Sequence, residues 1–225
     1  MSRGSEDARV AVYQAFRTTG RPPSIESLAE ELQTRSDVIV ENLGELAAQR
    51  HLVLNDAGEI VMAHPFSAIP LGFSVMGAKT LWWGGCSWDS FALSHLITEE
   101  PEVLVASRCP GCDRAGAWVV NRESPPVSDW LAHFLVPTAQ MWDDVVHSCS
   151  NQRLFCSDEC LNDWLRAHDY EKGYAMDVAT LWRLASRWYE GRFDHGYQRR
   201  EPAAARDYFK SVGLKGSFWG LDDDS

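Results

Sequence analysis

The chain has 225 residues, of which 45% are hydrophobic and 24% charged, and this composition excludes a disordered tail, a collagen and a small disulfide scaffold. The formal net charge of -11 opposes the basic surface that nucleic-acid binding by the whole molecule requires. No apolar run reaches the roughly 20 residues of a membrane-spanning helix, and the first ten residues resemble no secretion signal. We therefore expect a cytoplasmic protein with no membrane partner, in which the six cysteines stay reduced.

Residues 1–66 follow the order of a winged-helix-like module. Apolar spacing predicts helices over 5–18, over a segment that starts after Ser24, and over 36–49, with a break at Gly20–Pro23 between the first two. Two short apolar runs, 52–54 and 60–62, then flank an Asp-Ala-Gly turn and predict a hairpin.

The charge of this module argues against DNA binding. Residues 1–66 hold six basic and ten acidic side chains, and the position of a recognition helix, 36–50, carries Asp37, Glu41 and Glu45 against Arg50. Binding to phosphates requires the opposite sign of charge. We therefore expect a packing or dimerising module and no nucleic-acid partner.

The remaining chain predicts a mixed α+β fold in two parts. Residues 67–170 form the predicted core, and residues 171–225 a helical extension that flanks it. The strands predicted in the core cover 73–75, 103–105, 117–120, 133–136 and 145–149. The predicted helices cover 90–97, 157–168 with Ser157 as its cap, 176–189 and 201–212.

Cys86 and Asp89 form the first candidate site, where a Gly-Gly turn enters a helix. Backbone amides at a helix N-terminus stabilise a thiolate and lower the pKa of a cysteine. Positions 86 and 89 are one turn apart, so thiol and carboxyl group can share a pocket walled by Trp82, Trp83 and Trp88. Burial would raise the pKa of Asp89 and let it deliver a proton near neutral pH. The alternative is a buried structural cysteine beside an aspartate that binds the helix amides.

Four further cysteines have the spacing of a structural zinc site. Cys109-Pro-Gly-Cys112 has the spacing of a zinc knuckle, and Cys156 and Cys160 lie one turn apart at a predicted helix start. Four thiolates would close a tetrahedral site. The alternatives are reduced cysteines without a metal and a redox-active Cys-Pro-Gly-Cys pair.

Cys86 and Cys149 then remain unassigned. Two thiolates suit a soft metal, and a nearby carboxylic acid can protonate the group that the metal releases. The pair therefore predicts soft-metal chemistry.

In these residues the chain resembles the organomercurial (alkylmercury) lyase family. The resemblance covers about residues 5–170 and is carried by Cys86-x-x-Asp89, by Cys149 followed by Phe155 and Ser157, and by the preceding winged-helix pattern. Cys109 matches a further family cysteine that is thought to be structural. Cys112, Cys156 and Cys160 are additions to the pattern of the best-known members, and we place no counterpart of residues 171–225 in it.

The resemblance implies protonolysis of a carbon–mercury bond without a catalytic cofactor. Cys86, Asp89 and Cys149 would be catalytic, Trp83 and Trp88 would line the substrate pocket, and Cys86 and Cys149 would hold the Hg(II) product until thiol acceptors remove it. The main alternative function is a soft-metal carrier or sensor that uses the same thiols without cleaving a bond, and a DNA-binding regulator is the third. A carrier needs both thiols, whereas a lyase also needs the proton of Asp89.

Overall fold

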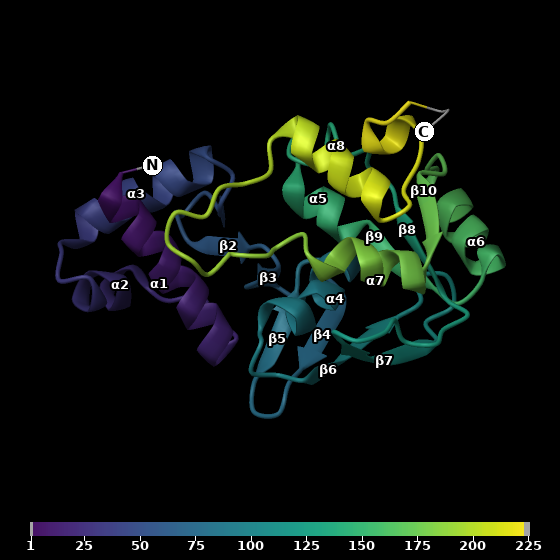
Figure 1. Cartoon of the computed structure of the whole chain (residues 1–225), viewed down its shortest axis with the longest axis horizontal. Helices are drawn as coiled ribbons and strands as arrows, with labels where there is room; N and C mark the ends of the chain where they lie inside the picture. Colours follow the sequence, from purple (N-terminus) through teal and green to yellow (C-terminus); the bar gives the residue numbers. More distant parts are fainter. Residues whose placement is uncertain (1, 223–225) are drawn as a thin grey trace.

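The computed structural model describes residues 2–222, with the N-terminal helices at one end of an elongated molecule (Figure 1). The helices α1 (Arg3–Thr19), α2 (Ile25–Glu31) and α3 (Ser36–Ala48) follow the predicted pattern. Ser2 and Ser24 cap the first two by accepting hydrogen bonds from backbone amides. The strands β1 (Val53–Leu54) and β2 (Ile60–Ala63) then form the predicted antiparallel hairpin.

This hairpin is one end of a seven-stranded antiparallel sheet with the order β1-β2-β3-β5-β4-β6-β7. The further strands are β3 (Phe66–Ser67), β4 (Phe73–Met76), β5 (Leu81–Gly84), β6 (Glu102–Arg108) and β7 (Ala115–Asn121). The short strand β3 joins β2 to β5, so the N-terminal helices and the body of the protein share one sheet.

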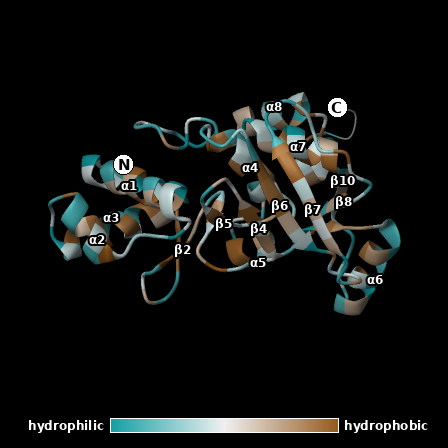
Figure 2. Ribbon diagram, turned by 90° about the horizontal axis from the view of Figure 1, so that it is seen from below, coloured by the Kyte–Doolittle hydropathy of each residue, from teal (hydrophilic) through white to brown (hydrophobic). Residues whose placement is uncertain are grey.

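Helix α4 (Ser87–Leu96) covers the inner face of this sheet. All of its residues from Ser87 to Ser94 are buried, because strands lie below it and helix α7 (Val178–Ser186) packs against its other side. The outer face of the sheet leaves Met76, Leu104 and Val119 exposed on the neighbouring strands β4, β6 and β7. These three strands lie side by side in Figure 2. Because α4 lies between the sheet and α7, its first turn is shielded from water.

A second, three-stranded antiparallel sheet has the order β10-β8-β9. Its strands are β10 (Tyr174–Asp177), β8 (Leu131–Phe134) and β9 (Gln152–Phe155), with α5 (Val145–Ser150) before β9 and α6 (Asp158–His168) after it. Ser157 caps α6 as predicted, since its hydroxyl accepts from the amide of Cys160.

Two predicted elements differ from the structure. The run 145–149 was expected as a strand but forms helix α5, because the Asp144 side chain accepts a hydrogen bond from the amide of His147 and starts a helical turn. The helix expected over 176–189 is shorter. Tyr174–Asp177 pairs with β8 as a strand, and Asp177 then caps α7.

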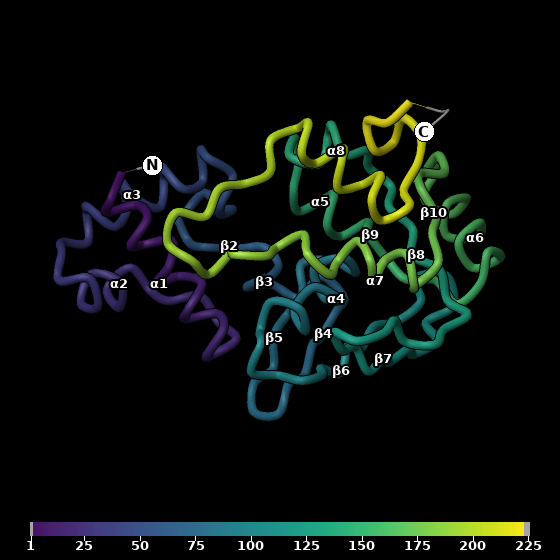
Figure 3. The backbone as a smooth tube through the Cα atoms, in the orientation of Figure 1, coloured from purple at the N-terminus to yellow at the C-terminus, as the bar shows by residue number. Residues whose placement is uncertain are grey.

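The segment 187–201 returns from α7 to the N-terminal helices before the chain enters α8 (Pro202–Ser211) and the short 3-10 helix η1 (Ser217–Trp219) (Figure 3). Arg9 in α1 is fully buried and donates to the carbonyl of Arg192 at 2.6 Å. The amide of Gly196 donates to Glu6 at 2.7 Å. This segment therefore links helix α7 in the body of the protein to helix α1 in the N-terminal module. Of the helices within residues 2–222, none has the length and apolar character to cross a membrane.

Candidate active site

Cys86 and Asp89 meet at the start of α4, as the sequence predicts. Cys86 is the N-cap of the helix, and its sulfur accepts from the amide of Asp89 at 3.4 Å. A Cβ atom at Gly85 would lie 2.3 Å from Oδ2 of Asp89, so a larger residue in the preceding turn would displace the carboxyl group. The Gly-Gly turn thus brings the carboxyl group close against the backbone.

Asp89 is surrounded by protein, with 1% of its surface exposed. Burial raises its pKa to about 7, although hydrogen bonds from Tyr189 and Cys86 and the charge of Arg192 favour the carboxylate. The Tyr189 hydroxyl donates to Oδ1, whereas Oδ2 has no hydrogen-bond partner among residues 2–222. Asp89 can therefore hold a proton at neutral pH, as expected, and Oδ2 is the oxygen free to exchange it.

Cys149 approaches from helix α5, and it and Cys86 shift the pKa of each other. Burial, together with Cys149 and Asp89, raises the pKa of Cys86 well above its ordinary value. For Cys149 the side chain of Cys86 favours the thiolate, but burial and the charge of Asp89 outweigh it and raise the pKa. The lowered pKa that we expected for Cys86 is therefore wrong. Burial destabilises the thiolate more than the backbone amide of Asp89 stabilises it.

His64 is a site residue that no sequence pattern marked. Its Nε2 lies 3.4 Å from the sulfur of Cys149 and 4.0 Å from Oδ2 of Asp89. Burial lowers its pKa to about 3, so the imidazole is neutral. It follows strand β2 and is brought to the cysteines by the sheet, which is a tertiary contact without a local signal.

These residues line a cavity of about 680 Å³. The tryptophans in its walls are Trp88, Trp142, Trp188 and Trp219. Of the tryptophans expected there, Trp88 lines the cavity but Trp83 does not. Trp83 lies on β5 with 36% of its surface exposed, and Trp82 points to the opposite face, where its indole donates to the carbonyl of Phe16.

The segment after α7 supplies functional groups that the sequence did not reveal. Tyr189 reaches Asp89, and Arg192 lines the same cavity. Because Tyr189 is 100 residues from Asp89 in the chain, only the fold brings the two together.

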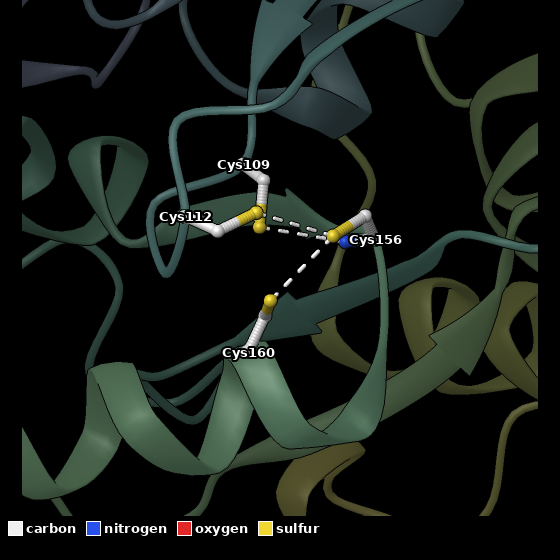
Figure 4. A group of neighbouring side chains, drawn as sticks. All are labelled: Cys109, Cys112, Cys156 and Cys160. Atoms are coloured by element: carbon white, nitrogen blue, oxygen red, sulfur yellow. Dashed lines mark hydrogen bonds between the residues drawn. The ribbon is translucent and has the colours of Figure 1, made fainter.

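The other four cysteines gather at a separate place (Figure 4). Cys109 and Cys112 lie in the turn between β6 and β7, while Cys156 and Cys160 lie at the start of α6. Their sulfur atoms all lie within 4.8 Å of one another.

Two buried thiols beside a carboxyl group that holds a proton at neutral pH define a thiol-dependent enzyme site suited to a soft metal. The profile of the alkylmercury lyase family matches residues 66–190, which is more than half of the chain. The match continues past residue 170, where we expected the resemblance to end, and it includes Tyr189. The chain belongs to this family, and it is an enzyme that cleaves carbon–mercury bonds.

Two further comparisons concern the whole chain. A solved structure described as the mercury-bound form of MerB2 is similar, with a TM-score of 0.65 and 18% identity over 86% of this chain and 93% of that chain. At this identity the likeness shows the fold. A search of curated proteins found no significant match.

Proposed function

We propose that Cys86, Cys149 and Asp89 cleave the carbon–mercury bond by protonolysis. The observation that carries this assignment is the meeting of the two thiols with a carboxyl group whose pKa lies near 7, in one tryptophan-walled cavity. Mercury prefers sulfur ligands, and the departing carbon needs a proton.

The reaction begins with exchange of mercury between thiols. One cysteine displaces the thiol that carries the organomercurial, and its own proton leaves with that thiol. The carboxylate of Asp89 then takes the proton of the second cysteine, which binds mercury as a thiolate. Because both thiol pKa values are raised, a base beside them is needed near neutral pH.

Proton delivery completes the cleavage. Asp89 gives the proton from Oδ2 to the carbon, the electron pair of the carbon–mercury bond forms the new carbon–hydrogen bond, and the hydrocarbon leaves. Tyr189 donates to Oδ1 and holds the carboxyl group so that Oδ2 faces the thiols and His64. Hg(II) stays between Cys86 and Cys149 until two external thiols remove it and return two protons.

The test measures hydrocarbon release and mercury retention separately, with an aryl mercurial and excess thiol. Cys86→Ser and Cys149→Ser should each lose turnover, because one sulfur holds mercury but does not activate the carbon. Asp89→Asn should still bind the mercurial but release arene about 100- to 10,000-fold more slowly, which is the usual contribution of a positioned acid.

Asp37→Asn, which changes an exposed aspartate in α3, is the matched control and should behave as wild type. Full turnover in Asp89→Asn would remove the proton donor from this mechanism. Wild-type protein that keeps the intact organomercurial and releases no arene would instead be a carrier.

A further inference from the structure

A second thiol cluster lies outside the cavity and has no part in the proposed reaction. It consists of Cys109, Cys112, Cys156 and Cys160, none of which lines the cavity that holds Cys86 and Cys149. All four are free cysteines.

The distances in this cluster suit a tetrahedral metal. The sulfur of Cys156 lies 3.4 Å from that of Cys112 and 3.5 Å from that of Cys160. A disulfide requires about 2.0 Å, whereas four sulfurs at about 2.3 Å around zinc lie about 3.8 Å apart. The thiols are thus spaced for a shared ion and too far apart for a covalent bond.

The surrounding backbone is shaped around the same four sulfurs. The amide of Cys156 donates to the sulfur of Cys109 at 3.5 Å. A Cβ atom at Gly111 would lie 2.3 Å from the carbonyl oxygen of Cys160, so the turn passes the helix at a distance that only glycine allows. Two segments distant in sequence therefore meet with their thiols directed at one point (Figure 4).

We propose that Cys109, Cys112, Cys156 and Cys160 hold one structural zinc ion. Four protein ligands leave no open position, so the metal has no role in bond cleavage. It ties the turn between β6 and β7 to the start of α6 and thereby joins the two sheets. Strand β9 runs from the helix that carries Cys149 to Cys156, so the zinc also anchors one end of the element that positions a catalytic thiol.

Metal analysis of the full-length protein, purified without added metal, tests this proposal. We expect one zinc per chain in wild type and in the matched cysteine controls Cys86→Ser and Cys149→Ser, and loss of zinc in Cys112→Ser. Cobalt substituted into wild type should show the absorption bands of tetrahedral four-thiolate coordination.

The cobalt spectrum of the wild-type protein tests four-thiolate coordination even if Cys112→Ser does not fold. Folded wild-type protein without metal, or with a disulfide among these four cysteines, would overturn the zinc assignment. So would equal loss of zinc in Cys86→Ser, because the metal would then lie in the cavity.

A separate observation concerns charge inside the cavity. Arg192 has 4% of its surface exposed, and its Nε and Nη1 atoms are buried without a hydrogen-bond partner within residues 2–222. Buried guanidinium groups are ordinarily paired. The rings of Tyr189 and Tyr197 lie 5.0 Å and 4.7 Å from the guanidinium group, but no described side chain accepts a hydrogen bond from Nε or Nη1.

Two more arginines extend this positive region. The guanidinium groups of Arg50 and Arg199 lie 5.8 Å and 4.5 Å from the ring centre of Trp142. Burial and the charges of Arg192 and Arg50 lower the pKa of Arg199. Within residues 2–222, five arginines line the cavity, namely Arg50, Arg192, Arg199, Arg200 and Arg206, and the acids that line it are Asp89 and Glu201. This excess of positive charge stands in a chain with a net charge of -11.

We infer that Arg50, Arg192 and Arg199 bind a carboxylate of the incoming mercury compound. The inference rests on the proposed function, because the compound must reach Cys86 and Cys149 in the same cavity. The carboxylate belongs either to the organic group or to the small thiol that carries the mercury.

Matched substrates separate these two sources. Phenylmercury is compared with its 4-carboxy derivative, both with 2-mercaptoethanol, and methylmercury is compared with 2-mercaptoethanol and with 3-mercaptopropionate. We expect the carboxylate to raise kcat/KM about tenfold in at least one pair through charge-assisted hydrogen bonds. Arg199→Gln should abolish that preference mainly through KM, and Arg35→Gln, at an exposed site in the N-terminal module, should keep it.

Turnover of phenylmercury with the neutral thiol tests the lyase mechanism by itself. If that turnover occurs and no carboxylate preference is found in either pair, the anion site is overturned and the mechanism stands. If no turnover occurs, binding of the two aryl mercurials is compared by tryptophan fluorescence. Equal affinities would overturn the anion site, and tighter binding of the carboxylate that is lost in Arg199→Gln would support it.

Discussion

Burial of Asp89 raises the pKa of its carboxyl group into the range where the group can both accept and donate a proton. A carboxyl group in water holds its proton only under acidic conditions, but burial at the start of α4 brings the pKa to about 7. Hydrogen bonds from Tyr189 and Cys86 and the charge of Arg192 oppose this shift and keep the carboxylate accessible. The group can therefore both take a proton from a thiol and return it to carbon within one turnover.

This raised pKa has a consequence for stability. The folded state binds the Asp89 proton more tightly than the unfolded chain, so wild type should lose stability as the pH rises from about 4 to about 7. Over that range Asp89→Asn should gain up to about 4 kcal/mol relative to wild type, since the shift is about three pKa units. Urea unfolding of both proteins at pH 4, 6 and 8 measures the difference. A difference that does not change with pH would show that Asp89 is not perturbed by burial.

Tyr189 should tune the same carboxyl group. Its hydrogen bond favours the carboxylate, so Tyr189→Phe should raise the pKa of Asp89 further. The acidic limb of the kcat/KM profile for arene release should move up by about one pH unit, the value of one hydrogen bond. Tyr170→Phe, outside the cavity, is the control. An unchanged profile in Tyr189→Phe would limit Tyr189 to a packing role.

At the scale of elements, the segment 187–201 connects the active site to the N-terminal helices. It carries Tyr189 and Arg192 to the cavity and is held by Arg9 of α1, which donates to two carbonyl groups of the segment and pairs with Glu6. The N-terminal helices therefore have a part in supporting the site, whatever other role they have.

Removing this contact should affect both stability and catalysis. Arg9→Ala removes the ion-pair partner of Glu6 and the donor to the buried carbonyl of Arg192 and the partly buried carbonyl of Asp194. We expect a loss of about 3 kcal/mol in unfolding free energy. Faster proteolysis within 187–201 and slower arene release should accompany it. Arg21→Ala, at an exposed position, should change neither. Normal activity in a destabilised Arg9→Ala protein would separate this contact from the active site.

At the scale of the whole molecule, charge is distributed unevenly. The chain is acidic overall, whereas the cavity collects arginines. Residues 1–66 have more acidic than basic side chains, and several of the acids lie on α3, the helix that a winged-helix protein would present to DNA. The order of three helices and a hairpin is observed, but a winged-helix role remains a prediction.

We therefore predict no specific binding of duplex DNA. In a mobility-shift experiment at low salt, where phosphate contacts are strongest, the protein should not retain genomic fragments. A basic winged-helix protein serves as the positive control. Retention that depends on DNA sequence would contradict the charge argument and indicate a regulatory role for residues 1–66.

Local sequence determined much of this protein. The Gly-Gly-Cys86-x-x-Asp89 turn, the caps Ser24 and Ser157, the two spaced cysteine pairs and the first three helices follow from residue types a few positions apart. Such features depend on hydrogen bonds and side-chain spacing within one or two turns, which are visible in a single segment.

The tertiary structure decided what surrounds those motifs. It directed Trp83 away from the cavity, placed Cys149 on a helix, and brought His64, Tyr189 and Arg192 to the thiols from distant segments. It also reversed the expected direction of the Cys86 pKa. The physical reason is that burial and electrostatic fields are set by all neighbours in space, whereas the helix amides near Cys86 are a local property of the chain.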